Sequence, residues 1–396
     1  MSRLSLIVTS FDVGPWIEAA LQGAARVLRP GDELIVVDDA SRDDSPARIR
    51  AFGQSGHLAP GVAFRPVLLG CNTPGGVGPA ANIGMSLAQG EVLAFLDGDD
   101  WLDPEGFDAV RDRFEEALSG PAPLDLLIAN YTEWHEGLNA PRLPADARLW
   151  HGVETLEGED ARSRALEMIA VPWRKLYRRD FIETHGLRFP EGDFFFEDNP
   201  FHWAVCRAAT RIAFHDRVLC RHRIARPGQT MASSGPELLA FFTHFRTIMA
   251  GIGRREHHAR ILALRWLAQN MSWHMERMRL DTIIPWIDAA REALADVPAR
   301  LWRREVLPHY DVWAREILQA IREDRLDLAE RRIMAIACAR NARQAEQQLQ
   351  SLQGEIDRLR ADLAEIRGNA TATDPDETDR LLQEFERLRH ASGPAT

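Results

Sequence analysis

Apolar runs and amphipathic stretches alternate along the first 130 residues of the chain. The apolar runs lie at 4–8, 33–37, 62–69, 92–96 and 124–129, and the helical patterns lie near 15–28, 44–52, 77–88 and 104–118. Strands that alternate with helices predict crossover units between parallel strands. We therefore expect an α/β fold with a Rossmann-like, mostly parallel sheet in this part of the chain.

Three of the apolar runs end in polar residues. The sequences that follow are "TSFD" at 9–12, "DDASRDD" at 38–44 and "DGDD" at 97–100. In such sheets ligands bind at the carboxyl ends of the strands, so the pattern gathers acidic side chains on one ligand-binding edge. The last sequence places three carboxylates close together, and these repel one another unless a positive charge lies beside them.

The rest of the chain has a different pattern. Residues 131–230 are less regular, whereas almost all of 236–367 has helical periodicity and is rich in tryptophan and arginine. The sequence "TATDPDET" is typical of a flexible linker, and "DRLLQEFERLR" after it predicts a short amphipathic helix. We therefore expect a catalytic-type α/β domain at 1–232, a helical domain at 233–335, a coiled-coil helix at 336–368 and a flexible tail with that short helix at 369–396.

The coiled-coil prediction depends on a stripe of apolar or small residues at alternating spacings of four and three. The stripe consists of Cys338, Ala342, Ala345, Leu349, Leu352, Ile356, Leu359, Leu363 and Ile366, and it ends at Gly368-Asn369. An isolated helix cannot bury such a heptad stripe. We predict that it forms a homo-oligomer, most simply a dimer. The alternative is that the helix folds back on its own chain.

Composition narrows the classes of function. The formal net charge of −11 argues against general nucleic-acid binding. The cysteines show no spacing typical of a zinc site or a disulfide framework, which indicates reduced thiols. The first residues lack the apolar run of a signal peptide, and no stretch approaches the roughly 20 apolar residues of a membrane span. We expect a cytoplasmic protein.

Two interpretations explain the acidic sequence at 97–100. In the first, Asp103 caps a helix that begins at Pro104, and the earlier acids favour the N-terminus of that helix. This explains Asp103 well and Asp97 poorly. In the second, the acids hold a divalent cation, because Mg²⁺ and Mn²⁺ prefer carboxylate oxygens and readily bridge to phosphate. The position directly after a buried strand favours the metal site.

Four stretches of the chain, in this order, resemble the signature of family 2 glycosyltransferases of the bacterial type. They are "LIVTSFD" at 6–12, "LIVVDDASRDDS" at 34–45, "GPAANIGMSLAQGEVLAFLDGDDWL" at 78–102 and "FFEDNPFHW" at 195–203. The resemblance covers about residues 3–230. It implies a catalytic domain of the GT-A fold that binds a nucleotide-sugar donor, followed here by an α-helical region and a C-terminal coiled coil.

The resemblance assigns several strand-end residues to the nucleotide. Asp39, with Asp38 beside it, matches the acid that hydrogen-bonds a uracil-type base, and a carboxylate can accept the ring N–H of such a base. A turn residue before Ser41 is the alternative interpretation of Asp39. Thr9 and Phe11 match positions that line the nucleotide pocket.

The resemblance assigns the acidic sequence to the metal. Asp97 matches the first acid of the Asp-x-Asp motif, near the ribose and the metal, and Asp99 matches the direct metal ligand. Asp100 is expected to support both. The cofactor would be Mn²⁺ or Mg²⁺, acting as a Lewis acid on the leaving diphosphate. A bound cation would offset the repulsion among the three carboxylates, and the diphosphate would complete the site.

A second acidic pair precedes another helix. On structural grounds alone, Asn199 caps a helix that begins at Pro200, and Glu197 and Asp198 complement its dipole. The resemblance makes Asp198 the general base for the acceptor hydroxyl, places Glu197 on the acceptor side and implies inverting transfer. The two interpretations are compatible, because a helix N-terminus favours the ionised form that a base needs.

Two further segments resemble parts of the family's site. "CRHRIARPGQT" resembles a basic segment that closes over the diphosphate, which makes His222, Arg223 and Arg226 donor-binding candidates; a solvated basic loop is the alternative. "VPWRKLYRR" resembles a segment on the acceptor side, where Trp173 could stack on a sugar face. A buried tryptophan needs no such role.

Two positions depart from the family pattern. Ala81 stands where many relatives carry an arginine that supports the acidic cluster or the diphosphate, and Asp12 stands where asparagine is common. Neither position coincides with the metal or base residues. The departures therefore concern donor affinity more than reaction type.

Together these features predict a metal-dependent, inverting glycosyltransferase of the hexosyltransferase type. It would move a sugar from a nucleotide donor, a UDP-sugar, to a hydroxyl of a glycan or lipid-linked saccharide in cell-surface polysaccharide synthesis. One alternative is a nucleotidyltransferase, although no glycine-rich phosphate loop follows the first strand. The other is a coiled-coil scaffold with an inactive transferase-like domain.

For the helices around Trp266 and Trp273, ordinary packing is favoured over peripheral contact with the inner face of an anionic membrane.

Overall fold

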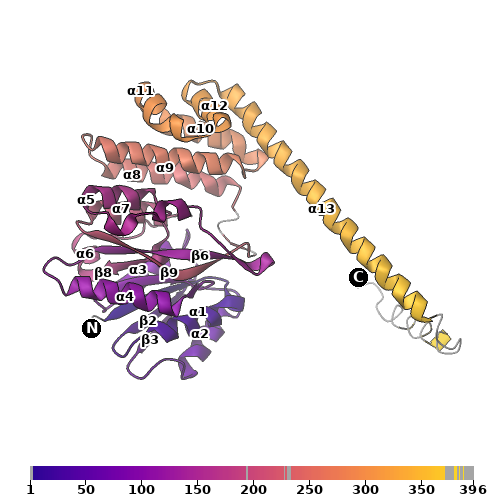
Figure 1. The fold of residues 1–396 in the computed structure, drawn as a ribbon, viewed down its shortest axis with the longest axis horizontal. Coiled ribbons are helices and arrows are strands. Elements are labelled where there is room, and N and C mark those ends of the chain that lie inside the picture. Colours follow the sequence, from indigo (N-terminus) through magenta and orange to yellow (C-terminus); the bar gives the residue numbers. More distant parts are fainter. Residues whose placement is uncertain are drawn as a thin grey trace. The chain divides into compact units, whose positions relative to one another are not determined.

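The computed structural model of the protein describes residues 3–192, 195–226, 228–229 and 233–370, together with residues 379, 380, 383 and 387. The chain divides into two units, Met1–Ile333 and Met334–Thr396. The strands of the described residues all belong to the first unit (Figure 1). The boundary predicted between residues 232 and 233 falls inside this unit.

Parallel strands and the helices between them form the N-terminal part of the sheet, as the apolar pattern predicts. The elements are β1 (Leu4–Ser10), α1 (Gly14–Val27), β2 (Glu33–Asp38), α2 (Ser45–Gln54), β3 (Ala63–Leu68), α3 (Gly78–Leu87) and β4 (Val92–Asp97). β1 lies between β2 and β4, and β3 borders β2, all in parallel. β1 and β2 are buried along their whole length, as expected for strands covered on both faces.

The register of these strands brings their carboxyl ends together. Thr9 in β1 pairs with Asp97 at the end of β4, and Ser10 pairs with Asp38 at the end of β2. The acidic side chains therefore gather at one edge of the sheet, as predicted from the order of strands and helices.

The second half of the sheet is mixed. Its elements are β5 (Trp101–Leu102), α4 (Pro104–Leu118), β6 (Leu126–His135), β7 (Ala140–Arg142), α5 (Gly158–Glu167), β8 (Lys175–Arg178), α6 (Arg179–Thr184), α7 (Asp198–Ala208) and β9 (Ile212–Ile224). The strand order is β3-β2-β1-β4-β8-β6-β9-β5, and β7 pairs with β6. β8 runs antiparallel to β4 and β6, whereas β9 runs parallel to β6 and antiparallel to β5. The predicted α/β class with a Rossmann-like parallel half is confirmed.

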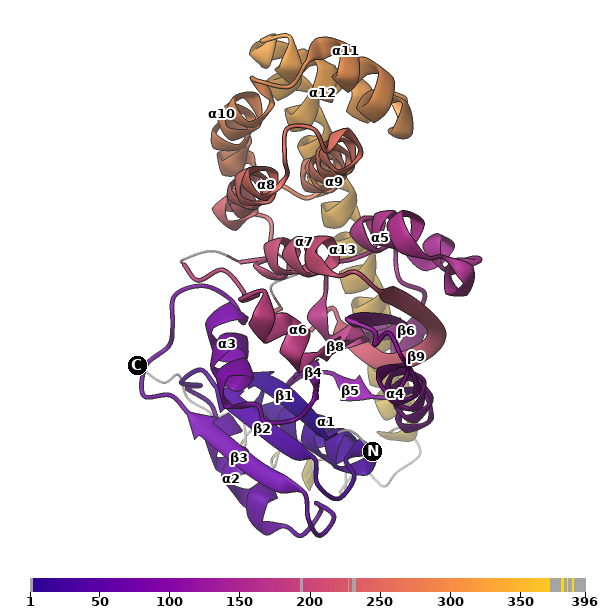
Figure 2. The same ribbon diagram turned by 90° about the vertical axis from the view of Figure 1, so that its left-hand side faces the viewer.

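Further helices follow the sheet domain along the chain, and the last of them runs from the first unit into the second. They are α8 (Ala240–Gly251), α9 (His257–Met275), α10 (Ile283–Leu294), α11 (Ala299–Leu301), α12 (Val312–Arg322) and α13 (Leu326–Ala370). α7 packs against α8, and α5 packs against α9. In both ribbon views α5 and α7 lie between the sheet and the α8–α9 pair (Figures 1 and 2). The helical character predicted for 236–367 is confirmed.

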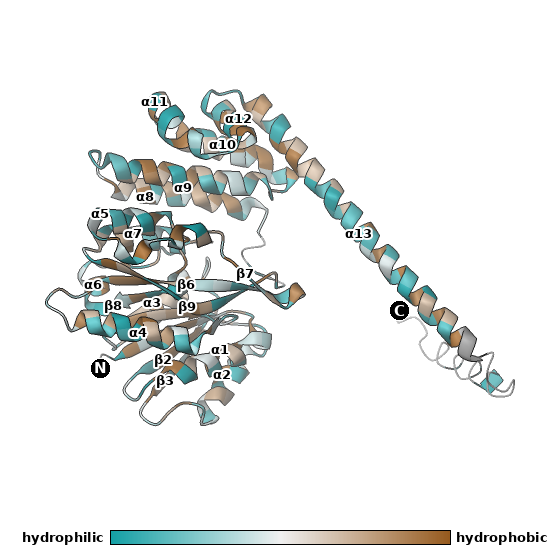
Figure 3. Cartoon of the chain, in the orientation of Figure 1, coloured by the Kyte–Doolittle hydropathy of each residue, from teal (hydrophilic) through white to brown (hydrophobic). Residues whose placement is uncertain are grey.

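The heptad stripe lies on α13, a helix of 45 residues. Near its start, Ala329, Ile333 and Ala337 are buried. Further along, the large stripe residues are exposed: Leu349, Leu352, Ile356, Leu359, Leu363 and Ile366. Figure 3 shows this alternation of hydrophobic and hydrophilic residues along α13.

The amphipathic helix predicted at 379–389 lies outside the described residues except for four isolated positions. None of the described helices has an apolar stretch long enough to cross a bilayer.

Candidate active site

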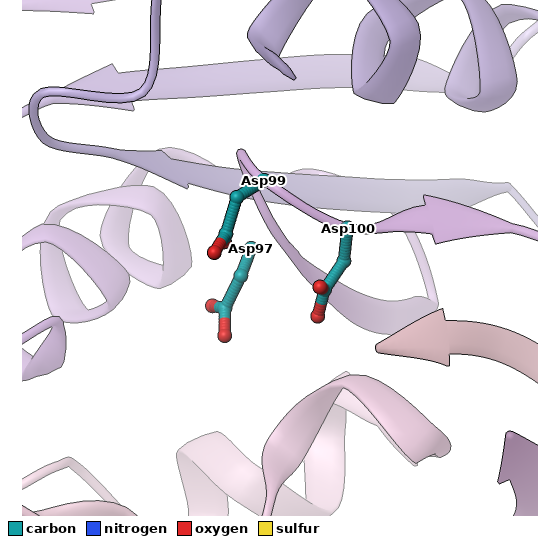
Figure 4. A group of neighbouring side chains, drawn as sticks. All are labelled: Asp97, Asp99 and Asp100. Carbon is teal, nitrogen blue, oxygen red and sulfur yellow. The ribbon is translucent and has the colours of Figure 1, made fainter. Parts of the chain in front are cut away.

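Three carboxylates converge where β4 ends. Asp97 is the last residue of β4, and Asp99 and Asp100 lie in the turn before β5. Their side chains point to the same side (Figure 4), and one oxygen of each lies within 4.8 Å of the others. Thr9 Oγ1 donates a hydrogen bond to Asp97 Oδ1 at 3.1 Å. Such a set of hard oxygen atoms suits a divalent cation. We call these three residues the acidic cluster.

The acidic cluster is buried, and its charges oppose one another. Asp99 is 6% exposed and Asp100 is 1% exposed. Burial, with the neighbouring charges of Asp100 and Asp99, holds the pKa of Asp97 well above its ordinary value. Burial also raises the pKa of Asp100, although His222 opposes the shift. A cation held by these oxygens would relieve the repulsion, so the residues fit the predicted metal site.

The end of β9 lays basic groups on the acidic cluster. His222 Nδ1 is hydrogen-bonded to Asp100 Oδ2 at 2.9 Å, and the backbone N–H of Arg223 donates to Asp100 Oδ1 at 2.7 Å. Arg226 forms an ion pair with Asp99. Burial alone would lower the pKa of His222, but the charges of Asp100 and Asp99 raise it to about 9. The chain itself therefore supplies part of the positive charge that the acidic sequence requires.

Residues that the sequence pattern does not indicate support these arginines. The Arg226 guanidinium lies 5.0 Å from the ring centroid of Trp16, and the Arg223 guanidinium lies 4.8 Å from that of Trp101. Arg223 also forms an ion pair with Glu136. These partners come from α1, β5 and the turn after β6, so no local spacing could identify them. Stacking of this kind holds a guanidinium in place without neutralising it.

A cavity of about 280 Å³ opens beside the acidic cluster. Its wall contains the predicted donor residues Thr9, Phe11, Asp39, Asp97, Asp99, His222 and Arg226. The wall also includes Gly75, Gly76 and Val77, which belong to the loop between β3 and α3. The structure therefore brings most of the predicted donor residues around one space.

Asp39 joins that loop to the sheet. Its carboxylate accepts hydrogen bonds from Asn72 Nδ2 at 2.8 Å and from Thr73 Oγ1 at 2.9 Å. The backbone N–H of Thr73 donates to the same carboxylate at 3.0 Å. Because Asp39 lines the cavity and also holds its neighbouring loop, it does more than end a turn.

Five predicted site residues do not line the cavity: the acidic pair Glu197 and Asp198, described below, and Asp38, Trp173 and Arg223. Asp38 is fully buried and accepts hydrogen bonds from Ser10 Oγ at 2.8 Å and Ser41 Oγ at 2.6 Å, so it fixes the turn after β2. Trp173 is 2% exposed, and its ring stacks on that of His222 with centroids 5.0 Å apart. Arg223 lies behind the cavity wall, where its Nε donates to the backbone oxygen of Asp99 at 2.9 Å. These residues support the site from its buried side.

Neither of the two departures from the family pattern is among the residues that line the cavity. Ala81 is 1% exposed within α3, and the guanidinium near the acidic cluster comes from Arg226 instead. Asp12 has a left-handed backbone with φ of 49° and forms an ion pair with Arg42 at 2.5 Å. Both residues have local structural roles here.

The second acidic pair lies at the start of α7, and one prediction about it is wrong. The helix begins at Asp198, not at Pro200, and Asn199 is already helical. Phe196 adopts a left-handed φ of 66°, which turns the chain into the helix earlier than the proline position indicates. Asn199 Nδ2 donates to Phe196 O at 3.0 Å and does not cap the helix.

Of this pair, Glu197 is buried and Asp198 is half-buried. Burial raises the pKa of Asp198, and the charges of Lys175 and His222 oppose the shift. Burial and the charge of Asp198 raise the pKa of Glu197 to about 7. Glu197 Oε1 accepts a hydrogen bond from the backbone N–H of Gly78 at 2.7 Å. Buried carboxyl groups with raised pKa values beside a cavity are typical of general acid–base sites.

Residues 195–199, which we call the base segment, are held by the helical region. His244 of α8 is hydrogen-bonded through Nε2 to Phe195 O at 2.7 Å. Trp266 Nε1 of α9 donates to Asn199 Oδ1 at 3.1 Å. The helices therefore contribute to the site, although sequence reasoning treated them as packing elements. No spacing relates residues 244 and 266 to the base segment, so sequence alone gave no indication of this.

Known proteins are similar to the chain. The family model described as glycosyl transferase family 2 matches residues 5–186. The chain is 28% identical over 225 residues to the uncharacterised glycosyltransferase EpsJ of Bacillus subtilis (strain 168), covering 56% of this chain and 60% of that protein. It is 23% identical over 312 residues to the poly(ribitol-phosphate) beta-N-acetylglucosaminyltransferase TarS of Staphylococcus aureus (strain MW2), covering 76% and 51%. The chain thus spans less than two thirds of either relative.

Solved structures share the fold. The structure of S. aureus TarS 1–349 in complex with UDP-GlcNAc matches with a TM-score of 0.66 at 20% identity, covering 84% of this chain and 91% of that chain. The mannosyltransferase PcManGT from Pyrobaculum calidifontis, in complex with GDP-Man and Mn²⁺, matches with a TM-score of 0.50 at 18% identity, covering 86% and 87%. Coverage of this extent includes the helical region as well as the sheet.

Proposed function

The chain carries a glycosyltransferase domain of family 2, and from this premise we propose that it transfers a sugar from a UDP-sugar to an acceptor hydroxyl with inversion. One observation carries the proposal. Asp39, Asp97 and Asp99 line one cavity, and the acidic pair at the start of α7 lies beside its wall, because Glu197 bonds to Gly78 next to the lining residue Val77. A donor site and a candidate base therefore meet, although their sequences lie about a hundred residues apart.

The donor class is argued from the cavity and from the relatives. Asp39 lines the cavity and could accept the ring N–H of a uracil base. The TarS neighbour was solved with UDP-GlcNAc and with UDP, which favours a UDP-sugar. The acceptor class, a glycan or lipid-linked saccharide, rests on the family resemblance. A role in polysaccharide synthesis and a peripheral membrane contact stay predictions.

Asp97 and Asp99 would hold a divalent cation, with Asp100 supporting them. Mn²⁺ or Mg²⁺ suits their oxygen atoms, and the PcManGT neighbour was solved with Mn²⁺. When bound, such a cation supplies Lewis-acid stabilisation of the departing diphosphate. His222 and Arg226 lie at the same cavity wall and add positive charge where the diphosphate would lie.

Asp198 would act as the general base. As the acceptor oxygen attacks the anomeric carbon, its proton passes to the Asp198 carboxylate, the new oxygen–carbon bond forms and the bond to the diphosphate breaks. Inversion requires the base on the side opposite the leaving group. Lys175, the only lysine of the chain, favours the ionised carboxylate that this step needs.

A panel of nucleotide sugars tests the function directly. Thermal shift with Mn²⁺ present should identify the donor, because a ligand that binds the folded state raises its melting temperature. Release of UDP from that donor, dependent on metal, should follow. A nucleotidyltransferase would instead leave the nucleotide on the acceptor, and an inactive scaffold would release nothing. Either outcome would overturn the proposal.

For the second unit we propose self-association through α13. In a parallel pair of α13 helices, Leu349, Ile356 and Leu363 would occupy a positions, and Leu352, Leu359 and Ile366 would occupy d positions. Glu355 would then take a g position and Arg360 an e position, a complementary pair between the two copies. Their charges favour a second copy of this chain as the partner of the exposed stripe.

Truncation after Ala337 is therefore expected to convert a dimer into an active monomer. The truncated chain keeps Ala329, Ile333 and Ala337, which are buried near the start of α13, so the first unit should stay folded. Light scattering of both proteins at micromolar concentration measures the change. In the full chain, Leu359→Glu on the stripe should also give a monomer, whereas Ala361→Glu on the outer face should not. A monomeric full-length protein would contradict the proposal.

A further inference from the structure

The carboxylate of Glu197 lies directly behind the glycine-rich wall of the donor cavity. The backbone N–H of Gly78 donates to it at 2.7 Å. Glu197 is 3% exposed and faces the loop, away from solvent. Gly75, Gly76 and Val77 form the cavity wall on the other side of the same backbone.

The glycines let the loop lie this close. A Cβ atom at Gly76 would lie 2.5 Å from Glu197 Oε1 and 2.7 Å from Oε2, distances that real Cβ atoms do not adopt. A Cβ atom at Gly78 would lie 2.8 Å from Glu197 Cγ. Two glycines therefore pack their backbone against one buried side chain, and at Gly76 the contact is with its carboxylate.

From these contacts we propose that Glu197 is a positioning residue that fixes the loop of residues 75–78 as the wall of the donor cavity. Because Glu197 precedes Asp198 directly, the same residue joins the donor wall to the base. Sequence reasoning placed Glu197 on the acceptor side. The contacts instead assign it to the donor side, as a hydrogen-bond acceptor that takes no proton from the acceptor hydroxyl.

The surroundings of Glu197 support a structural anchor. Asp198 is the ionisable neighbour that acts on its pKa. The loop and α3 present backbone groups to it, and neither contains a charged residue. The nearby Glu191 accepts a hydrogen bond from Asn82 Nδ2 at 2.8 Å, and His244 of α8 is bonded to Phe195 O. Glu191 and His244 therefore have other hydrogen-bond partners, whereas the Gly78 N–H bonds directly to the Glu197 carboxylate.

The proposal rests on the proposed function for its donor, and paired substitutions test it. In the full-length protein with Mn²⁺, Gly76→Ala should weaken UDP binding roughly tenfold, because the new methyl group displaces the carboxylate from the Gly78 N–H and a hydrogen bond to a charged group is lost. Glu197→Ala should weaken binding by a similar factor. The double variant should bind no worse than Glu197→Ala alone, because the methyl group then occupies vacated space.

A conservative variant separates positioning from proton transfer. Glu197→Gln keeps an oxygen that can accept the Gly78 N–H, so its UDP affinity and turnover should stay within a few-fold of wild type. Calorimetry with UDP and steady-state kinetics measure both, and melting temperatures check folding. Additive losses in the double variant, or a turnover of Glu197→Gln as low as that of Glu197→Ala with unchanged UDP affinity, would overturn the proposal. A wild-type protein that binds no UDP would instead refute the proposed function.

Discussion

Replacement of Asp198 by asparagine is expected to lower turnover by roughly 10²–10⁴-fold, the usual contribution of a positioned general base. Asparagine keeps the size of the side chain but cannot take the acceptor proton. UDP affinity should stay near that of the wild type, because Asp198 does not line the donor cavity. Steady-state kinetics with saturating acceptor, together with calorimetric titration of UDP, separate these two effects.

A matched control makes this result specific. Asp180→Asn removes the same charge from a side chain that is 82% exposed on α6, and its turnover should stay unchanged. If Asp198→Asn retained the wild-type rate while the acceptor was saturating, another group would have to take the proton. The acidic pair would then be a structural feature of the start of α7.

The raised pKa of Asp198 also gives the sign of a pH effect. Transfer needs the ionised carboxylate, and burial stabilises the protonated form, so turnover should fall as the pH is lowered through a range above that of an ordinary aspartate. Because Glu197, with a pKa raised to about 7, titrates beside it, the profile belongs to the pair. This acid-side decrease should be absent from the residual activity of the Asp198→Asn variant.

The sequence predicts the parts of the site that follow from strand order. Buried apolar runs end in polar residues, and parallel strands bring those ends to one edge of the sheet, so the pattern alone predicts that the ends of β1 and β4 lie together; there Thr9 pairs with Asp97. The cap of α4 is equally local: Asp103 accepts a hydrogen bond from Gly106 N at 3.1 Å, as its position before Pro104 predicts. Such features depend on neighbours in sequence or on the order of elements.

The parts that could not be predicted depend on tertiary contacts between distant segments. Phe196 has a left-handed backbone because its surroundings fix it, and that conformation moves the start of α7 ahead of Pro200. Trp266 reaches Asn199 only because α9 packs against α8, which in turn packs against α7. Similarly, the sequence around Gly76 and Gly78 is typical of a flexible loop. Both positions need glycine because the side chain of Glu197, more than a hundred residues away, packs against their backbone. Helical periodicity predicts which face of a helix packs against the protein. It does not identify the distant residue to which a polar group on that helix will bond.

Replacement of Asp99 by alanine is expected to abolish the metal dependence of UDP binding. Asp99 is one of three residues whose oxygen atoms lie within 4.8 Å of one another, and it lines the donor cavity. Loss of an outer-sphere partner alone typically costs 10–100-fold in metal affinity, so loss of a direct ligand should cost at least roughly 100-fold. The substitution also removes the ion pair between Asp99 and Arg226. The positive charge of Arg226 can then act on the diphosphate, so part of the UDP affinity should remain without metal.

Titration of UDP with Mn²⁺ and with a chelator measures this effect, and the Mn²⁺-induced change in melting temperature measures metal binding without turnover. Asp103→Asn is the matched control. It removes one negative charge close to the acidic cluster, yet asparagine can still cap α4 through Gly106 N, so metal-dependent UDP binding should persist. If UDP binding to the Asp99→Ala variant still required Mn²⁺, the metal would have to bind somewhere other than the acidic cluster. In that case positive side chains of the chain itself would offset the repulsion among these carboxylates, as His222 does beside Asp100 and Arg226 beside Asp99.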